Sequence, residues 1–293
     1  MSNVLPITLI GGYLGSGKTT LVNRLLADPA LPDGTAVLVN DFGDINIDES
    51  LIRSQSADGT VIGLSNGCIC CSIRDDLSQA LDQLTQLSVK QVIVEASGVA
   101  EPVRIWQHCH YPGFAPKAAV VLVDASQIHQ RLQDKYVGKL AQAQLDQAHL
   151  LVISKTDLNP AFQLNRLQPS FSSNDPALVA TVLGWQQSTQ PAAPLPRTVQ
   201  FGAHTWQQQQ ELPLAVLERF LREMSDQVHR AKGWVKTDAG YYQVSAVGKE
   251  LSLEAVTGLP SGAQLGLVFI YRLDSDAHTG GFAPDQITMT LSG

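Results

Sequence analysis

A glycine-rich loop near the start of the chain has the residue types and spacing of a phosphate-binding loop. Residues 12–19 read GYLGSGKT and match the pattern G-x-x-x-x-G-K-S/T in full. Glycines let backbone N–H groups point at phosphate oxygens, while the lysine reaches the β- and γ-phosphates and the next hydroxyl ligates Mg²⁺. The complete pattern disfavours the alternative, a glycine-rich turn with an incidental lysine. The predicted nucleotide-binding residues are Gly12, Gly15, Ser16, Gly17, Lys18, Thr19 and Thr20, with Thr19 as the Mg²⁺ ligand and Lys18 also catalytic.

The sequence SKTD at residues 154–157 has features of a base-recognition loop. It follows the apolar run Leu150–Ile153, so Asp157 falls just past a predicted strand end, where ligands bind in open α/β sheets. An aspartate there can accept two hydrogen bonds from guanine, whereas adenine has no donor at N1. The stem of Lys155 can lie along the base. Guanine-binding proteins usually have asparagine in place of Ser154, so we expect guanine with weaker selectivity. The alternative is a polar turn in which Asp157 caps a helix.

A second acidic residue, Glu95, ends another apolar run. Residues 91–94 read QVIV and predict a strand, and the segment EASG follows at 95–98. A glutamate at this point can hold Mg²⁺-bound water or orient the attacking water, and Gly98 can present its N–H to the γ-phosphate. Common switch GTPases have Asp-x-x-Gly where this chain has Glu-x-x-Gly. We therefore predict that Glu95 is catalytic and that Gly98 binds nucleotide, against the alternative of a solvated glutamate at a strand end.

Three of the four cysteines are crowded into the segment Cys68-Ile69-Cys70-Cys71. In an extended segment Cys68 and Cys70 point to the same side, and two thiolates make a soft site for Zn²⁺, Cu(I) or Co²⁺. The alternatives are a redox dithiol or small buried residues near the nucleotide. Three cysteines so close together cannot easily form a tetrahedral cage alone. The candidates for further ligands are Asp41, Asp44, His108, Cys109 and His110.

Short apolar runs alternate with helical patterns in the first part of the chain. This alternation predicts an α/β fold with a doubly wound, mostly parallel sheet, because strands that are apolar throughout are covered on both faces. The expected strands are Ile7–Ile10, Ala36–Val39, Val61–Leu64, Gln91–Val94, Ala118–Val123, Leu150–Ile153 and Ala177–Leu183. The expected helices are Lys18–Leu26, Asp75–Leu87 and Ile128–Ala148.

The composition changes after Leu183. We predict a P-loop domain over residues 1–184, a proline-containing linker over 185–197 and a smaller α+β domain over 198–293. In that last part, the pattern of Leu214–Met224 predicts an amphipathic helix. The expected strands, which suggest an antiparallel sheet, are Val199–Phe201, Val228–Lys236, Tyr241–Val247, Leu251–Ala255 and Leu265–Tyr271.

Composition excludes several classes of protein. A net charge of −7 without a dense basic block argues against a non-specific nucleic-acid binder. The longest apolar runs are strand-sized, so no transmembrane helix and no membrane partner are predicted. The first residues lack a secretory signal, and four cysteines are too few for a disulfide scaffold, so we expect a cytoplasmic protein.

The ordered set of motifs resembles the CobW-type P-loop GTPases, which include YjiA-like metal-binding proteins and zinc metallochaperones. The resemblance covers nearly the whole chain, and Val228–Gly233 looks like the start of the family's C-terminal domain. The segments that carry it are GGYLGSGKTT at residues 11–20, NDFG at 40–43, GCICC at 67–71, EASGVAEP at 95–102 and SKTD at 154–157.

The resemblance implies a GTPase that binds GTP and GDP with Mg²⁺, and that couples hydrolysis to binding zinc or a similar metal and handing it to a metalloprotein client. It implies metal-binding thiols at Cys68, Cys70 and Cys71. Asp41 stands where the family usually has glutamate, and a carboxylate there could serve the metal or the switch. We hypothesise that residues 41–48 sense the γ-phosphate and that intrinsic turnover is slow. Some relatives serve cobalt insertion in cobalamin synthesis, so Co²⁺ stays open.

Two further functions remain as alternatives. A P-loop kinase that transfers the γ-phosphate to a small molecule would explain the phosphate loop, but gives no reason for the cysteine segment. A nucleotide-gated scaffold with a redox switch would predict a reversible disulfide between Cys68 and Cys70 or Cys71, and no bound metal.

Overall fold

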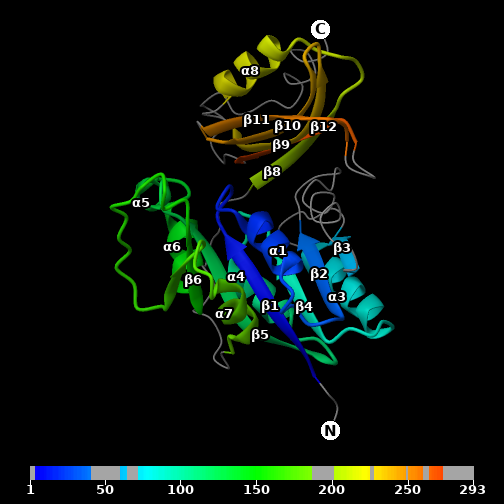
Figure 1. Cartoon of the computed structure of the whole chain (residues 1–293), viewed down its shortest axis with the longest axis vertical. Helices are drawn as coiled ribbons and strands as arrows, with labels where there is room; N and C mark the ends of the chain where they lie inside the picture. Colours follow the sequence, from blue (N-terminus) through cyan, green and yellow to red (C-terminus); the bar gives the residue numbers. More distant parts are fainter. Residues whose placement is uncertain are drawn as a thin grey trace.

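The computed structural model describes residues 4–40, 60–64, 72–186, 201–224, 228–248, 250–259 and 264–272. These residues form two sheets, one above the other (Figure 1). The N-terminal sheet has seven strands in the order β3-β2-β4-β1-β5-β6-β7, and all its described pairings are parallel. The predicted doubly wound P-loop architecture is therefore confirmed.

Strands of the N-terminal sheet and the helices that cover it mostly alternate along the chain. In order they are β1 (Leu5–Gly12), α1 (Lys18–Ala27), β2 (Thr35–Asn40), β3 (Thr60–Leu64), α3 (Ser72–Thr85), β4 (Gln91–Glu95), α4 (Pro102–His108), β5 (Phe114–Asp124), α5 (Ile128–Gln133), α6 (Gly138–Asp146), β6 (Leu150–Ser154), β7 (Ser170–Ser172) and α7 (Leu178–Gly184).

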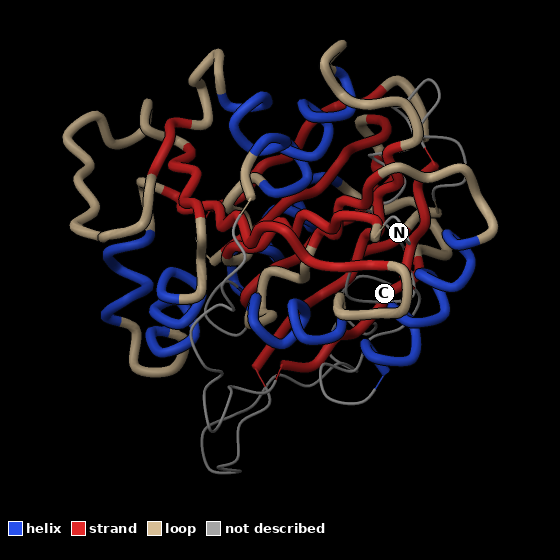
Figure 2. The backbone as a smooth tube through the Cα atoms, turned by 90° about the horizontal axis from the view of Figure 1, so that it is seen from below, coloured by secondary structure: helices blue, strands red, loops and turns tan. Residues whose placement is uncertain are grey.

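Helices cover both faces of this sheet (Figure 2). Leu9 of β1 packs in a buried cluster with α3 and α4, whereas the next residue, Ile10, packs in a second cluster with α1 and α7. Because successive strand residues point to opposite faces, a strand covered on both sides must be apolar throughout. This explains why the apolar runs predicted the strands well.

One predicted strand is wrong. The run Ala177–Leu183 forms helix α7, and Leu178, Val179 and Val182 are the residues that it buries. These three residues share one face of the helix. In a short apolar run the sequence alone does not distinguish the helical period of 3.6 residues from the strand period of two. The seventh strand is instead the short, polar β7, which the sequence did not indicate.

The single helix predicted over Ile128–Ala148 is also wrong, because it is broken into α5 and α6. The Oδ1 atom of Asp134 accepts hydrogen bonds from the backbone N–H groups of Tyr136 and Val137 and closes a turn there. Gly138 permits the close approach of the two helices, since an added Cβ would lie 2.7 Å from the carbonyl oxygen of Leu132. Helix α4 was not predicted at all.

The C-terminal sheet is antiparallel, as predicted, with strand order β11-β10-β9-β12-β8. Helix α8 (Leu214–Glu223) packs on it through Leu217, Phe220 and Leu221, and the ring of Phe220 meets that of Phe269 edge to face at 6.2 Å. The strands are β8 (Phe201–Gln207), β9 (Val228–Thr237), β10 (Gly240–Val247), β11 (Glu250–Val256) and β12 (Gly266–Arg272). The boundaries at residues 184 and 198 stay predictions, because residues 187–200 lie outside the described ranges.

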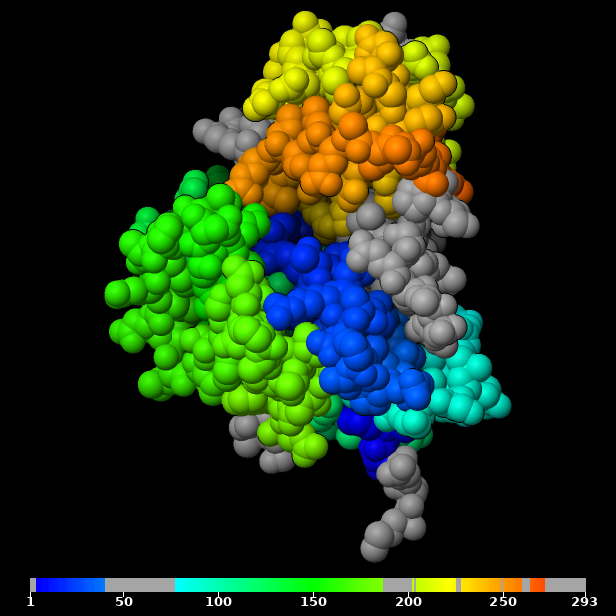
Figure 3. All heavy atoms as spheres, in the orientation of Figure 1, coloured from blue at the N-terminus to red at the C-terminus, as the bar shows by residue number. Residues whose placement is uncertain are grey.

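The carboxyl edge of the parallel sheet faces the C-terminal sheet (Figure 1), and Figure 3 shows the atoms of the C-terminal part lying above those of the N-terminal part. One apolar cluster joins the two. It combines Tyr13 and Leu14, which follow β1, with Val247 of β10 and Ile270 of β12. Within the part of the chain that the structure describes, no helix is long and apolar enough to cross a membrane.

Candidate nucleotide site

The phosphate loop connects β1 to α1 at the carboxyl edge of the sheet. Gly12 has a positive φ of 130°, and an added Cβ would lie 2.5 Å from the carbonyl oxygen of Leu122 on β5. Gly17 precedes α1 with φ 96°, in the left-handed region that glycine adopts without strain. The loop therefore needs glycine at both ends, and it directs the N-terminus of a helix, which favours negative charge, toward the nucleotide position.

Lys18 and Ser16 lie within the loop and are buried. The Nζ atom of Lys18 donates to the carbonyl oxygen of Tyr13 at 3.3 Å, so its charge lies against the loop itself. The Oγ atom of Ser16 is buried and has no hydrogen-bond partner among the described residues. Buried polar groups usually have partners, so this hydroxyl fits a phosphate oxygen as its acceptor. Thr20 is exposed at the start of α1.

Thr19 and Glu95 meet across the edge of the sheet. The Oγ1 atom of Thr19 donates to Oε1 of Glu95 at 2.9 Å. Only 3% of Glu95 is exposed, because β4 pairs with β1 on one side and β2 on the other. The alternative of a solvated glutamate is therefore wrong. A hydroxyl beside a buried carboxylate is an oxygen donor set that suits Mg²⁺, so the residues fit the metal predicted here.

Gly98 lies directly against the phosphate loop. An added Cβ would come within 2.7 Å of the backbone nitrogen of Leu14 and 2.8 Å of its Cα. Gln144 of α6 holds the segment from behind, since its Nε2 donates to the carbonyl oxygens of Gly98 at 3.2 Å and Ala100 at 2.9 Å. The role of Gln144 was not predicted from the sequence. The signal that could have indicated this role was a polar residue at a position of residues 140–145 where the pattern expects an apolar one.

Ser154 connects the predicted base loop to the phosphate loop. Its buried Oγ donates to the carbonyl oxygen of Ser16 at 2.8 Å and contacts that of Val123 at 3.2 Å. The serine that replaces asparagine therefore still braces the end of β6. Its effect on guanine selectivity stays a prediction.

Lys155 follows Ser154 with an unusual backbone, at φ 53°, and is the one non-glycine residue of the described ranges with positive φ. Its Nζ lies 2.7 Å from Oδ2 of Asp124 and 3.2 Å from Oε2 of Glu250. Burial lowers the pKa of Lys155, but hydrogen bonds and charge from these two carboxylates outweigh it and leave the pKa above its ordinary value. Asp157 is exposed in the turn that follows. No helix starts there, as residues 155–169 contain none, so the helix-cap alternative is wrong.

Two features of this edge were not predicted from the sequence. Asp124 ends β5 as Glu95 ends β4, so the same signal, an acidic residue after an apolar run, was present. The other is the turn after β7, which Arg24 of α1 fixes by donating to the carbonyl oxygens of Ser173 and, at 2.9 Å, Asp175. A three-residue polar strand gives no periodic signal from which this turn could be predicted.

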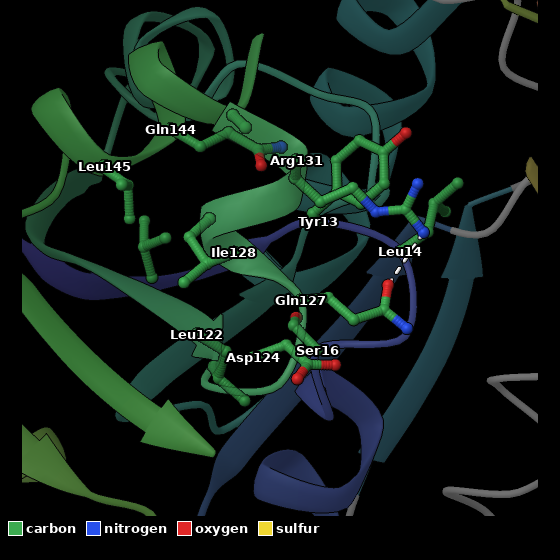
Figure 4. Close-up of a pocket in the computed structure, with 12 residues that line it drawn as sticks. Tyr13, Leu14, Ser16, Leu122, Asp124, Gln127, Ile128, Arg131, Gln144 and Leu145 are labelled. Carbon is green, nitrogen blue, oxygen red and sulfur yellow. Dashed lines mark hydrogen bonds between the residues drawn. The ribbon is translucent and has the colours of Figure 1, made fainter. Parts of the chain in front are cut away.

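A pocket lies between the phosphate loop, the end of β5, and helices α5 and α6 (Figure 4). Tyr13 and Ser16 reach it from the loop, and Arg131 from α5. The guanidinium carbon of Arg131 lies 5.3 Å from the centre of the Tyr13 ring, and its Nη2 donates to Oε1 of Gln127 at 2.8 Å. Arg131 therefore supports the loop through Tyr13.

The proposed metal site falls mostly outside the described residues. Cys68, Cys70, Cys71, Asp41 and Asp44 all lie in the ranges 41–59 and 65–71, which the structure does not describe. Among the described ranges, no three His, Cys, Asp or Glu side chains are grouped as a metal site would need.

The candidates His108, Cys109 and His110 lie at the other edge of the sheet. His108 ends α4 and the other two follow it, close to Gly113, whose carbonyl oxygen accepts from the N–H of Leu5 at the start of β1. The strand β3, which leads into the cysteine segment, ends at the carboxyl edge, where its Leu64 pairs with Asn40. Their role as additional metal ligands stays a prediction, because the cysteine segment lies outside the described residues.

Cys109 is expected to be unreactive in the folded protein. It is completely buried in an apolar cluster, and this burial raises the pKa of its thiol to about 12. Since the thiolate is the reactive form, its fraction at pH 8 is on the order of 10⁻⁴. Alkylation with iodoacetamide at pH 8, followed by mass spectrometry, should leave Cys109 unmodified in native protein and modify it in guanidinium chloride. Equal labelling in both states would contradict this expectation.

Comparisons with known proteins identify two domains in this chain. A family model described as the nucleotide-binding domain of CobW/HypB/UreG matches residues 6–177. A second, the C-terminal domain of the cobalamin synthesis protein cobW, matches residues 201–283. This match starts upstream of Val228–Gly233, the segment predicted from the sequence to be the start of that domain.

Among similar proteins, the zinc chaperone CobW of Pseudomonas aeruginosa is 29% identical over 210 residues, which are 61% of this chain and 56% of that protein. The zinc-regulated GTPase metalloprotein activator 1 of Dictyostelium discoideum is 39% identical over 117 residues, 34% of this chain and 24% of that protein. The crystal structure of the Zn(II)-bound YjiA GTPase from E. coli aligns over 98% of both chains with 20% identity and a TM-score of 0.45.

The chain spans about half the length of several curated relatives that it matches. The nucleotide-binding match nevertheless covers more than half of this chain and contains both the phosphate loop and the SKTD segment. The resemblance inferred from the motifs is thus confirmed, and the chain belongs to the CobW/HypB/UreG family.

Proposed function

We propose that this protein is a GTP-hydrolysing zinc chaperone, which couples the state of its nucleotide to the binding of zinc and to its transfer to a client metalloprotein. The observation that carries the proposal is the contact of 2.9 Å between Thr19 of the phosphate loop and the buried Glu95. It joins the loop that would hold the triphosphate to a carboxylate suited to hydrolysis. The names of the zinc chaperone and zinc-regulated GTPase relatives support zinc as the cargo.

The residues of the site have distinct roles in this proposal. The loop glycines and Ser16 bind the phosphates, and Lys18 balances the charge of the β- and γ-phosphates. Bound Mg²⁺ would neutralise the charge that develops on them, and Thr19 and Glu95 are the residues that would hold it. Gly98 presents its N–H toward the γ-phosphate.

The guanine end of the site is formed by residues 154–157. Ser154 braces this loop against the phosphate loop, so the two ends of the nucleotide are held at a fixed separation. The Asp157 carboxylate accepts two hydrogen bonds from the guanine base, and the aliphatic part of Lys155 covers one face of the base. Adenine would leave the Asp157 carboxylate without its two donors, so GTP is preferred over ATP.

The order of strands in the sheet supports coupling between nucleotide and zinc. Strand β3 leads into the cysteine segment, β2 leads into residues 41–48, and β4 ends at Glu95. These strands are neighbours, with Asn40 opposite Leu64 and Val39 opposite Glu95. The last described residues before these segments are Asn40, on the strand next to Glu95, and Leu64, on the strand beyond it. In this proposal, a change at the γ-phosphate acts on zinc through the segments that follow these strands.

The test is zinc affinity in two nucleotide states. Titration of Zn²⁺ into protein bound to GDP or to a non-hydrolysable GTP analogue should give dissociation constants that differ by at least about fivefold. The variant Cys68→Ala/Cys70→Ala/Cys71→Ala should lose both the tight binding and the difference. Co²⁺ and Cu(I), titrated in parallel, decide between the metals that soft thiolates accept.

The matched control is Cys109→Ala, which removes the remaining thiol from the core, away from the carboxyl edge. It should bind zinc as the wild type does. The proposal fails if zinc affinity is the same in both nucleotide states, or if the triple variant binds zinc unchanged. Transfer of phosphate to an added small molecule would favour the kinase, and a reversible disulfide without zinc binding would favour the redox scaffold.

A further inference from the structure

The C-terminal sheet contacts both ends of the candidate nucleotide site. At the phosphate end, the hydroxyl of Tyr13 lies 3.2 Å from Nδ1 of His229, and a Cβ added to Gly15 would lie 2.9 Å from Cγ2 of Val247. At the base end, Glu250 reaches the Nζ of Lys155 at 3.2 Å. The second sheet is thus placed to influence how the nucleotide is held.

Lys155 is held between two carboxylates from different sheets. Asp124 lies at the end of β5 and is itself fixed, because its Oδ1 accepts from the backbone N–H of Ser126 at 2.9 Å. Glu250 approaches the same Nζ from β11. The Lys155 side chain is 30% exposed and the Asp124 side chain 12% exposed, so the site is only partly screened by water. Both carboxylates therefore determine where the lysine stem lies.

The backbone around Glu250 is anchored, although its side chain is 44% exposed. Glu250 begins β11 opposite Val247 of β10, and Val247 is buried in the cluster that contains Tyr13. Gly248 turns the chain between them with φ 57°, and its N–H donates to the carbonyl oxygen of His229 at 3.3 Å. The position of Glu250 is therefore fixed by the contact between the sheets.

We propose that Glu250 is a positioning residue for the guanine base: it holds the Lys155 side chain in the orientation that covers the base, so the C-terminal sheet contributes to nucleotide affinity. The inference rests on the proposed guanine site. Without Glu250, the ammonium group of Lys155 pairs with Asp124 alone. The aliphatic part of the lysine side chain is then held by one carboxylate instead of two. The effect is on binding of the base, and the phosphates and Glu95 are unaffected.

The test compares GDP affinity, by isothermal titration, in Glu250→Gln and in the matched control Glu254→Gln. Glu254 lies on the same strand and is exposed, and it accepts from Ser252 without reaching the nucleotide site. We expect Glu250→Gln to raise the dissociation constant about three- to fivefold, whereas Glu254→Gln stays within about twofold. Glu250→Asp should restore part of the affinity. The KM for GTP should rise with Glu250→Gln while kcat is unchanged.

A double variant tests whether Glu250 acts through Lys155. In a Lys155→Met background, Glu250→Gln should have no further effect on the GDP dissociation constant, because the residue through which it acts is gone. If the full effect persists there, or if Glu254→Gln weakens GDP binding as strongly, the inference is overturned. Unchanged affinity in Glu250→Gln overturns it too, and leaves the proposed function standing. Failure of the wild type to bind GDP would overturn the proposed function itself.

Discussion

Replacing Lys18 with alanine is expected to lower the rate of GTP hydrolysis at saturating GTP by about 10²–10³-fold. Lys18 is buried within the phosphate loop, where its charge acts with little screening by water. The charge on the transferred phosphoryl group is stabilised chiefly by fixed cations around it, and no other lysine is part of this loop. The rate of phosphate release, measured at saturating GTP, reports the effect.

The control for this variant is Lys90→Ala, an exposed lysine in the turn before β4. It should hydrolyse GTP as the wild type does. The thermal unfolding temperature of Lys18→Ala should stay close to that of the wild type, because the substitution removes a hydrogen bond to Tyr13 and leaves the apolar core intact. A hydrolysis rate within about threefold of the wild type would show that the loop does not bind phosphate in the way proposed.

Replacing Gly98 with alanine is expected to lower the rate of GTP hydrolysis through a steric clash with the phosphate loop. The added methyl group would lie within 2.8 Å of the nitrogen and Cα of Leu14, and backbone cannot move aside as the end of a side chain can. The phosphate loop or the segment after β4 must shift, and displacements of this size cost about 10²-fold in rate. The free energy of unfolding should also fall by about 1–3 kcal/mol, as it does when a packed region is overfilled.

Gly184→Ala is the matched control for this prediction. Gly184 ends α7, and an added Cβ there meets nothing within 4 Å. Hydrolysis should match the wild type, and the free energy of unfolding should not fall but rise by at most about 1 kcal/mol. If Gly98→Ala hydrolyses GTP normally, the close approach of the two segments is not required for activity, and the assignment of Gly98 to the nucleotide site is wrong.

The parts of the fold that local pattern controls were predictable. Strands such as β1 and β4 have mostly apolar interiors because helices cover both faces, and their ends identify the edge that carries Lys18, Glu95 and Ser154. Failures came where two patterns overlap, as in Ala177–Leu183, or where one side chain ends a helix, as Asp134 does between α5 and α6.

The contacts that assemble the site could not be predicted from the sequence. The hydrogen bond from Ser154 joins residues that are 138 positions apart, and that between Tyr13 and His229 joins residues 216 apart. No periodicity or spacing encodes such a contact, because it depends on the packing of entire sheets. For the same reason the hydrogen bond from Ser154 to the carbonyl oxygen of Ser16 could not be predicted, and the effect of Ser154 on guanine selectivity stays a prediction.

The contact between Tyr13 and the C-terminal sheet changes how the phosphate-loop pattern should be understood. Phosphate chemistry leaves the x positions of G-x-x-x-x-G-K-T unrestricted, yet here Tyr13 and Leu14 occupy two of them and pack with Val247 and Ile270. These side chains must suit a neighbouring sheet as well as the loop. In relatives with the same arrangement, the residues at the variable positions of the loop should covary with residues more than two hundred positions downstream.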